Sequence, residues 1–243
     1  MPDHQEKICL IIPYYNEEKR LDMDRFAAGP ASCLFLFVND GSTDGTAHVI
    51  RKRLDNRVFL LDLLRNVGKA EAVRTGMLHA SRTPPLNEAA WIGYWDADLA
   101  TPLAEVNSFL RFCQLLEEER ADSVWGSRVY RLGSSIRRSY LRHLAGRLVA
   151  TAAGFLLGLP SYDSQCGAKL FRREIVEAAF SEPFISRWLF DIELVMRLKH
   201  FHIVEYPLRQ WSDISGNRFR IVTMALSVLP DLIRIRMRYG RLR

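Results

Sequence analysis

The chain has 243 residues, of which 48% are hydrophobic and 26% are charged. This composition excludes an intrinsically disordered protein, and the length is sufficient for one large α/β domain with a sizeable core. The net charge of +6 is concentrated in residues 123–162 and 218–243, which are either solvated basic faces or surfaces that contact an anionic partner.

The cysteines and the apolar segments indicate the compartment. The four cysteines have no metal-ligand spacing, and we expect them to be reduced core residues of a cytoplasmic protein. No secretory signal is visible, and no stretch approaches the roughly 20 apolar residues that span a bilayer. We therefore expect a protein that is soluble or lies on the surface of a membrane.

Apolar strands alternate with helices in the first half of the chain. This alternation predicts a parallel sheet, in which ligands bind beyond the carboxyl ends of the strands. Asp40, Ser42 and Asp44 are candidate caps for the second helix. The predicted strands are residues 7–16, 32–40, 57–64 and 89–98, and the predicted helices are residues 17–28, 45–54, 69–81 and 102–119.

The second half of the chain has a different pattern. A helix is predicted over residues 135–159, basic at its start and apolar at its end, and the C-terminal segment 218–243 is predicted to be helical with a break at Pro230. Between them we predict strands at 163–171 and 202–211 and helices at 172–180 and 187–201. The predicted fold class is α/β, with a Rossmann-like, mixed and mainly parallel sheet flanked by helices.

Polar residues follow each of the four N-terminal strands. Asp96 and Asp98 come directly after an apolar strand, where carboxylates are costly unless a cation compensates them. Mg²⁺ and Mn²⁺ take such ligands and complete their shell with phosphates and water, and the metal would neutralise a departing diphosphate. A glycine-rich dinucleotide motif and a P-loop are absent, which disfavours hydride transfer and ATP hydrolysis. The strand-end residues are Asn16, Glu17, Asn39, Asp40, Asn66, Lys69, Asp96 and Asp98.

Seven segments between residues 7 and 211 resemble, in order, the family 2 glycosyltransferases with a GT-A fold. Within that family the chain is similar to dolichyl-phosphate and polyprenyl-phosphate glucosyltransferases and to dolichyl-phosphate mannose synthases. The resemblance implies an inverting, metal-dependent transfer of a hexose to a polyprenyl or dolichyl phosphate at the cytosolic membrane face, with UDP-glucose the favoured donor and a GDP-hexose the other. The segments are IIPYYNEEKRL, FVNDGSTDGT, NVGKAEAVRTG, YWDADLATP, GSRV, DSQCGAKLF and RWLFDIELVMR.

The resemblance also implies roles for individual residues. Asp98 would bind Mg²⁺ or Mn²⁺ directly, and Asp96 would contact the metal or the ribose. Asp40 would recognise the base, and Lys69 would supply a cation near the donor. Ala70 stands where the family usually has a second glycine. The implied nucleotide-sugar site comprises Pro13, Tyr15, Asn16, Glu17, Asp40, Gly68, Lys69 and Asp96.

Two aspartates are candidates for the base that deprotonates the acceptor. Family members imply either Asp191, at the start of a helix, or Asp163, which opens the DSQCG segment. A phosphate monoester is already largely a dianion at neutral pH, so a lipid phosphate needs cations more than it needs a base. The candidate cations, which precede an apolar helix, are Arg128, Arg131, Arg137 and Arg138.

The predicted organisation is a catalytic domain at 1–211, with a membrane-facing insert at 130–160, and a basic amphipathic tail at 212–243. The protein would be peripheral on the cytosolic face of a membrane, held by the insert and the tail or by a membrane-protein partner. Two alternatives stay open, a non-lipid acceptor and a non-catalytic binder of nucleotide sugars. A nucleic-acid partner is disfavoured because no binding module is recognised.

Overall fold

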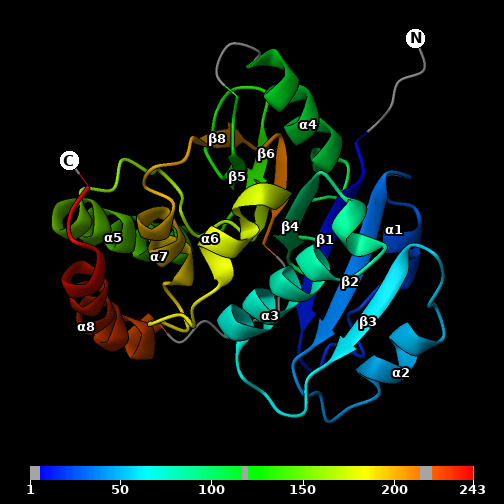
Figure 1. The fold of residues 1–243 in the computed structure, drawn as a ribbon. Helices are drawn as coiled ribbons and strands as arrows, with labels where there is room; N and C mark the ends of the chain where they lie inside the picture. The colour runs from blue at the N-terminus through cyan, green and yellow to red at the C-terminus, as the bar shows by residue number, and fades with distance from the viewer. Residues whose placement is uncertain (1–5, 117–119, 214–220, 243) are drawn as a thin grey trace.

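The computed structural model describes residues 6–116, 120–213 and 221–242, without the side chains of residues 141, 142, 145 and 221–227. The centre of this part is a seven-stranded sheet with helices on both faces (Figure 1). The strand order is β3-β2-β1-β4-β7-β5-β8. The strands are β1 (Ile8–Tyr14), β2 (Cys33–Asn39), β3 (Val58–Asp62), β4 (Trp91–Trp95), β5 (Ser123–Ser127), β7 (Ala168–Arg172) and β8 (Ile203–Pro207).

The first four strands form the parallel half of the sheet. β1 pairs in parallel with β2 and β4, and β2 pairs in parallel with β3, as the alternation of strands and helices predicts. β7 is antiparallel to both β4 and β5, whereas β8 is parallel to β5. The predicted mixed, mainly parallel sheet is confirmed. Because Trp95 pairs with Ala168, the start of β7 lies at the carboxyl end of β4.

Two layers of helices cover the sheet, and the side chains of β1 alternate between them. Leu10 and Ile12 pack on the face covered by α1 (Met23–Ala27), α2 (Thr46–Arg51) and α4 (Glu105–Leu115). Cys9 and Ile11 pack on the face covered by α3 (Lys69–Arg82), α6 (Val176–Phe180) and α7 (Phe190–Arg197). β1 is therefore buried on both faces, and the polar residues that follow it emerge at the edge of the sheet.

A third apolar cluster joins the helical insert to the C-terminal helix. It forms between α5 (Tyr140–Leu157), α7 and α8 (Ile221–Tyr239), which lie side by side at the left of Figure 1. α5 contributes buried residues at four-residue intervals, which places them on one face of the helix. The buried members include Val149, Ala153 and Leu157 of α5, Ile192 and Met196 of α7, and Val228, Leu232 and Ile235 of α8.

Two predicted elements are wrong in detail. Residues 135–137, predicted as the start of a helix, form β6 (Ser135–Arg137) because they pair in parallel with β9 (Gln210–Ser212). α8 continues through Pro230, where the sequence predicts a break. Val228 and Leu232 are buried on either side of Pro230, and this packing maintains the helix although proline removes one backbone hydrogen bond.

The remaining elements are the short 3₁₀ helices η1 (Leu86–Glu88) and η2 (Arg173–Ile175). Parts of two predicted helices, residues 117–119 and 218–220, lie outside the described part, as do residues 214–217 of the predicted tail. All four cysteines are free. Among the described residues, no helix combines the length and the apolarity that a membrane crossing needs.

Candidate active site

Side-chain hydrogen bonds join the turn after β1 to the turn after β2. Asn16 Oδ1 accepts from the Thr43 N–H at 2.9 Å, and the Asn16 N–H donates to Ser42 Oγ at 3.0 Å. The Glu17 N–H donates to Thr46 Oγ1 at 2.9 Å. Asn16 has a φ of +54°, which asparagine tolerates better than most residues. The two turns are therefore held together where the sequence predicts the nucleoside.

The predicted nucleoside residues lie on one continuous turn. Pro13 is half-buried at the end of β1, and Tyr15 is 44% exposed, so that its ring can be reached by a ligand. Glu17 Oε1 accepts from Arg20 Nη2 at 2.6 Å. Of the three candidate caps, Asp44 accepts from the Thr46 N–H at 3.0 Å at the start of α2. Contact between this turn and a nucleoside stays a prediction.

Asp40 is buried at the end of β2 and holds the loop before α3. Its Oδ1 accepts from the Val67 N–H at 2.7 Å, and its Oδ2 accepts from the Gly68 N–H at 2.9 Å. Burial raises the pKa of Asp40, while these two N–H groups and the Arg187 guanidinium oppose the shift. Gly68 has a φ of +91°, which glycine adopts without strain. Both Asp40 oxygens thus bind the loop before α3. Recognition of a base by Asp40 stays a prediction.

Lys69 and Asp96 form an ion pair between the start of α3 and the end of β4. Lys69 Nζ lies 2.5 Å from Asp96 Oδ1. Burial lowers the pKa of Lys69, but Asp96, Asp191 and Asp98 outweigh this effect, and the pKa is raised. The Asp96 N–H donates to the Gly167 carbonyl at 3.0 Å, and a Cβ at Gly167 would overlap the Asp96 carboxylate. The DSQCG segment therefore supplies the space in which Asp96 lies.

Asp98 is the second carboxylate at the end of β4. Its Oδ1 accepts from the Ala100 N–H at 3.0 Å, and the intervening Leu99 has a positive φ of +52°. Burial and the neighbouring Asp96 carboxylate both raise the pKa of Asp98. A divalent cation would relieve this repulsion. The residues therefore fit a metal at this place.

The metal would need ligands from outside the protein. No cluster of three or more His, Cys, Asp or Glu side chains suited to a metal occurs within the described ranges. Among the residues that the structure describes, Asp96 and Asp98 are thus two carboxylates without a third ligand of these types. Mg²⁺ is typically bound by one or two carboxylates together with phosphates and water, so this donor set suits a metal that arrives with a diphosphate.

Asp191 lies in the first turn of α7 and is bound by two buried groups. Lys169 Nζ lies 2.6 Å from Asp191 Oδ1, and the Tyr94 hydroxyl donates to the same oxygen. Burial and the Asp191 charge raise the pKa of Tyr94 well above its ordinary value, so the phenol stays protonated. Lys169 also donates to the Cys166 carbonyl at 2.6 Å and lies 4.6 Å from the centre of the Trp125 ring. Asp191 is therefore the counter-charge of a fully buried lysine, and its role as a base stays a prediction.

Asp163 forms a closed pair with Arg128. Arg128 Nε and Nη2 donate to the two Asp163 oxygens at 2.5 and 2.6 Å, and the Arg128 N–H adds a third bond at 3.0 Å. Burial opposes ionisation of Asp163, but Arg128 outweighs it and lowers the pKa of Asp163 to about 2. A general base works best with a pKa near the working pH. Asp163 therefore anchors Arg128, and its role as a base stays a prediction.

A small basic pocket lies between α5 and the DSQCG segment. Its lining includes Arg128, Arg138 and Arg147, together with Asp163 and Ser164. Burial, and to a smaller extent the charge of Arg128, lower the pKa of Arg138, while the Asp163 carboxylate opposes this shift. Three guanidinium groups against one carboxylate leave a net positive charge, which attracts anions.

The other two predicted phosphate ligands lie elsewhere. Arg131 is exposed and its Nη2 donates to the Pro207 carbonyl at 3.2 Å. Arg137 is exposed on β6. Neither residue lines the basic pocket. The structure thus brings together Arg128 and Arg138 of the predicted set, and adds Arg147.

Sequence reasoning missed Arg147, Lys169 and Arg187. Lys169 carried a usable signal, because a lysine inside an apolar strand is almost never buried without a partner. Arg147 stacks on the Tyr162 ring at 4.5 Å and donates to the Tyr162 carbonyl at 3.0 Å. Its contact partner follows 15 residues later, so spacing alone does not reveal it. Arg187 had no signal beyond its place at the start of a predicted helix.

Comparisons with known proteins identify the family of the chain. The profile of the family "Glycosyl transferase family 2" matches residues 9–180. A human dolichyl-phosphate beta-glucosyltransferase is 32% identical, over 96% of this chain and 76% of its own length. A dolichyl-phosphate beta-glucosyltransferase of Trichomonas vaginalis is 29% identical, over 97% of this chain and 74% of its own length.

Solved structures have the same fold. Glucosyl-3-phosphoglycerate synthase from Mycobacterium tuberculosis, in complex with Mn²⁺, UDP and phosphoglyceric acid, aligns with a TM-score of 0.67 at 19% identity, covering 95% of this chain and 78% of that one. A further complex of that enzyme contains Mn²⁺, UDP-glucose and phosphoglyceric acid and has a TM-score of 0.63 at 18% identity, covering 95% and 80% of the two chains. The chain has the GT-A fold and is a glycosyltransferase that belongs to glycosyl transferase family 2, homologous to dolichyl-phosphate beta-glucosyltransferases.

Proposed function

We propose that the protein is an inverting glycosyltransferase that moves glucose from UDP-glucose to a polyprenyl or dolichyl phosphate. The observation that carries this proposal is the placement of Asp96, Asp98 and Lys69 at one edge of the sheet, beside a separate basic pocket. The first group suits a metal-bound diphosphate, and the second suits a phosphate acceptor. The similarity to dolichyl-phosphate beta-glucosyltransferases supports the choice of donor and acceptor.

The donor site would use the turns after β1 and β2 and the loop before α3. The joined turns would form the wall against which the nucleoside lies, with Tyr15 exposed beside it. Asp40 would keep the Gly68 backbone in place for a close approach of the donor. Mg²⁺ or Mn²⁺, held by Asp98 and Asp96, would supply positive charge that stabilises the departing diphosphate. The complex of the related synthase with Mn²⁺ and UDP-glucose supports this choice of metal and donor.

The acceptor would be a phosphate monoester bound by Arg138, Arg147 and Arg128. One of its oxygens forms a bond to the anomeric carbon while the bond from that carbon to the UDP oxygen breaks, and UDP leaves with the electron pair. A single displacement of this kind inverts the anomeric configuration. Because the acceptor is mostly a dianion at neutral pH, no proton has to be removed. This explains how a site can work although Asp163 and Asp191 are both bound to buried cations.

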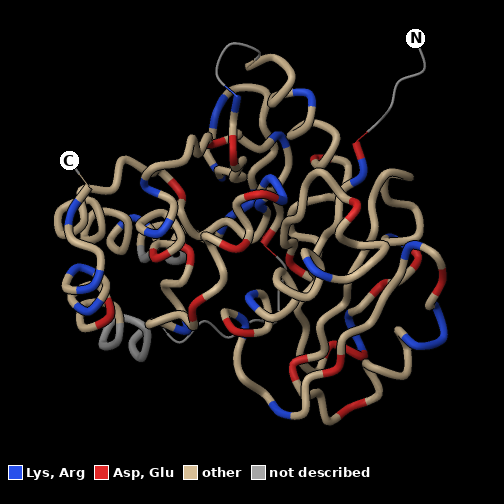
Figure 2. Tube along the Cα trace, in the orientation of Figure 1, with Lys and Arg blue, Asp and Glu red and all other residues tan. Residues whose placement is uncertain are grey.

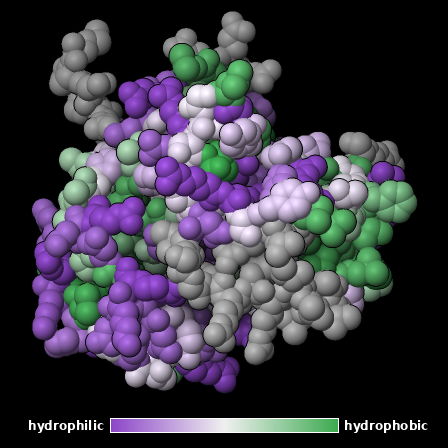
Figure 3. All heavy atoms as spheres, turned by 180° about the vertical axis from the view of Figure 1, so that it is seen from behind, coloured by the Kyte–Doolittle hydropathy of each residue, from purple (hydrophilic) through white to green (hydrophobic). Residues whose placement is uncertain are grey.

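The tail of a lipid acceptor would leave the pocket along α5 and α8. Figure 3 shows hydrophobic side chains on the side of the molecule where these helices lie, at the right of that view. Lys and Arg also occur along α8 (Figure 2). A surface that combines exposed apolar and basic residues suits the interface of an anionic membrane. The exposed apolar residues are Leu144, Leu148 and Phe155 of α5 and Leu229, Ile233 and Met237 of α8.

We accordingly propose a peripheral protein on the cytosolic membrane face, with residues 1–211 as the catalytic domain and the C-terminal tail as part of the membrane contact. A non-lipid acceptor is the second candidate. The related synthase in complex with phosphoglyceric acid supports it, because a soluble phosphate monoester would suit the same basic pocket.

A screen of donors and acceptors tests the proposed function. Purified protein with Mn²⁺ or Mg²⁺ is incubated with each of several UDP- and GDP-hexoses and with a short-chain polyprenyl phosphate, a soluble phosphate monoester or no acceptor. We expect release of UDP from UDP-glucose that depends on the polyprenyl phosphate, and loss of this release in Asp98→Ala. UDP release that depends on the soluble phosphate monoester instead would contradict the lipid acceptor. If no combination of donor and acceptor releases nucleotide, the result would support a non-catalytic binder of nucleotide sugars.

A further inference from the structure

Arg187 lies directly over the loop that begins α3. A Cβ at Gly68 would lie 2.8 Å from Arg187 Nη2 and 2.9 Å from its Nε, so the guanidinium occupies the space that the glycine leaves open. The charge of Arg187 also acts on Asp40, which binds the same loop from below. Arg187 comes from the segment before α7, far from Gly68 in the sequence. Two distant segments therefore meet at the predicted donor site.

Within the described residues, the Arg187 guanidinium has no acceptor, unlike three other cations of the candidate active site. Lys69 is paired with Asp96, Lys169 with Asp191, and Arg128 with Asp163. Arg187 is exposed, and its guanidinium forms no hydrogen bond or ion pair with the residues that the structure describes. The Arg187 guanidinium is planar, has several N–H donors and lies on a glycine turn. Such a group suits the oxygens of a phosphate.

The backbone at Arg187 is fixed by its neighbour Ser186. Ser186 is almost completely buried, and its Oγ accepts from the Trp188 N–H at 3.2 Å and from the Leu189 N–H at 2.9 Å. The same hydroxyl donates to Asp231 Oδ2 of α8 at 2.6 Å. Arg187 therefore follows a residue that α8 holds directly.

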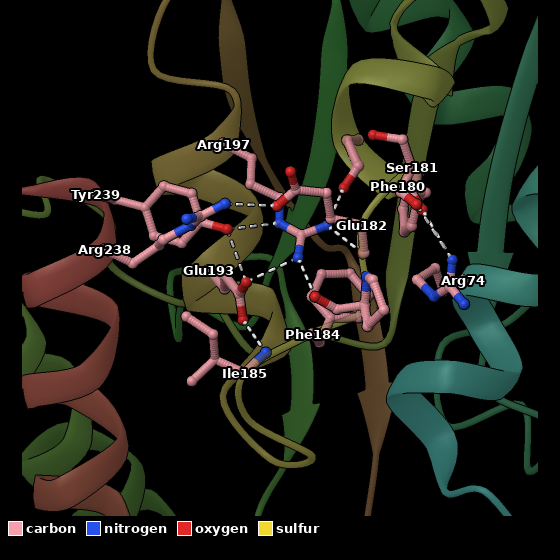
Figure 4. A network of polar contacts seen from close by, with 12 residues as sticks. Arg74, Phe180, Ser181, Glu182, Phe184, Ile185, Glu193, Arg197, Arg238 and Tyr239 are labelled. Carbon is pink, nitrogen blue, oxygen red and sulfur yellow. Dashed lines mark hydrogen bonds and ion pairs between the residues drawn. The ribbon is translucent and has the colours of Figure 1, made fainter.

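Hydrogen bonds also fix the residues that precede Ser186, as Figure 4 shows. Arg197 donates to the carbonyls of Glu182 and Pro183 at 2.8 and 2.7 Å, and Glu193 accepts from the Ile185 N–H at 2.8 Å. Arg197 and Glu193 are themselves a buried ion pair, and the Tyr239 hydroxyl of α8 donates to Glu193 at 2.9 Å. The segment from 182 to 189 is thus bound by hydrogen bonds to both α7 and α8.

We propose that Arg187 binds the diphosphate of the nucleotide sugar and that α8 positions it through the bond between Asp231 and Ser186. This inference rests on the proposed function, because it assigns a further residue to the donor site. Arg187 would neutralise negative charge on the diphosphate from its place over the Gly68 turn, which directly precedes Lys69. The C-terminal helix, besides its proposed contact with lipid, would then set the geometry of the donor site.

The test measures UDP binding without acceptor, by calorimetry in the presence of Mn²⁺. We expect Arg187→Ala to raise the Kd for UDP by about tenfold or more, with an unchanged melting temperature because the side chain is exposed. Arg187→Lys should recover part of the affinity, since a lysine keeps the charge and loses the planar donors. Arg82→Ala, which removes an exposed arginine at the other end of α3, is the matched control and should bind UDP like the wild type.

The positioning role of α8 is tested by a double-mutant cycle. Asp231→Ala should raise the Kd for UDP by a few-fold in the wild-type background and have no further effect in the Arg187→Ala background, because it acts through Arg187. Equal effects in both backgrounds would overturn the positioning role.

The remaining outcomes separate this inference from the proposed function. Unchanged UDP binding in Arg187→Ala would overturn the assignment. If UDP binding is unchanged while the KM for polyprenyl phosphate rises, the anion bound by Arg187 is the acceptor and the donor assignment is wrong. If the wild-type protein binds no UDP, the proposed function itself fails, and this inference fails with it.

Discussion

The pair formed by Asp163 and Arg128 gives the sharpest test of how the site is built. Asp163→Asn keeps the shape of the side chain and removes its charge, which leaves the Arg128 guanidinium without its counter-charge in a place where water has little access. Asp163 is only 7% exposed and receives three hydrogen bonds from Arg128. Breaking a buried pair by removing one partner typically costs about 3–5 kcal/mol of unfolding free energy.

The pH dependence follows from the pKa of Asp163. Burial disfavours its charge, but Arg128 lowers the pKa from 3.8 to about 2, a difference that corresponds to about 2 kcal/mol of stability. Because the folded-state pKa is the lower one, this stabilisation is fully present above the unfolded value of 3.8 and is lost as the pH falls towards 2. About half of it should be lost at about pH 3.

Urea unfolding at a series of pH values measures both quantities. We expect Asp163→Asn to be less stable than the wild type by about 3–5 kcal/mol at neutral pH, and the difference to narrow on acidification as Asp163 becomes protonated in the wild type. We also expect the variant to keep much of its kcat and to lose affinity for the acceptor, because Arg128 is no longer anchored. Near-normal stability together with abolished kcat would refute this reasoning and would assign Asp163 as the base.

Three further predictions concern other contacts of the site. Gly167→Ala should lower kcat/KM by about 100-fold with the fold retained by circular dichroism, because the added Cβ displaces the Asp96 carboxylate; activity near that of the wild type would show that Asp96 can move without consequence. Lys169→Met should lower the free energy of unfolding by about 3–5 kcal/mol in a urea titration, because Asp191 is left buried without its counter-charge. A loss under about 1 kcal/mol would contradict a buried ion pair at this place. Arg147→Ala should raise the KM for polyprenyl phosphate by about tenfold with little change in the KM for UDP-glucose, measured in steady-state assays; the reverse pattern would remove Arg147 from the acceptor pocket.

The parallel half of the fold could be predicted because each strand is a short apolar run followed by polar residues and a helix. The same pattern places Asn16, Asp40, Lys69 and Asp96 at one edge of the sheet, since the carboxyl ends of parallel strands meet there. The structure brings these residues close together through loops that bond to one another. The position of the proposed donor site can therefore be predicted from the sequence alone.

The acceptor side could be predicted only in part. Arg128 and Asp163 are 35 residues apart, and their pairing depends on the antiparallel insertion of β7 beside β4. A basic segment in the sequence does not show which arginines share a pocket. Of the four predicted cations, Arg131 and Arg137 do not line the pocket that contains Arg128. Pro230 shows a related effect, because tertiary packing of α8 overrides the local tendency of proline to end a helix.

The stereochemistry of the product tests the central claim most directly. The protein is incubated with UDP-glucose, Mn²⁺ and a short-chain polyprenyl phosphate, and the anomeric configuration of the glycolipid is determined by NMR. A single displacement on the α-linked donor predicts one product, the β-linked glucosyl phosphate, which should be absent with Asp98→Ala. An α-linked product, or free glucose as the only product, would contradict direct transfer to the lipid phosphate.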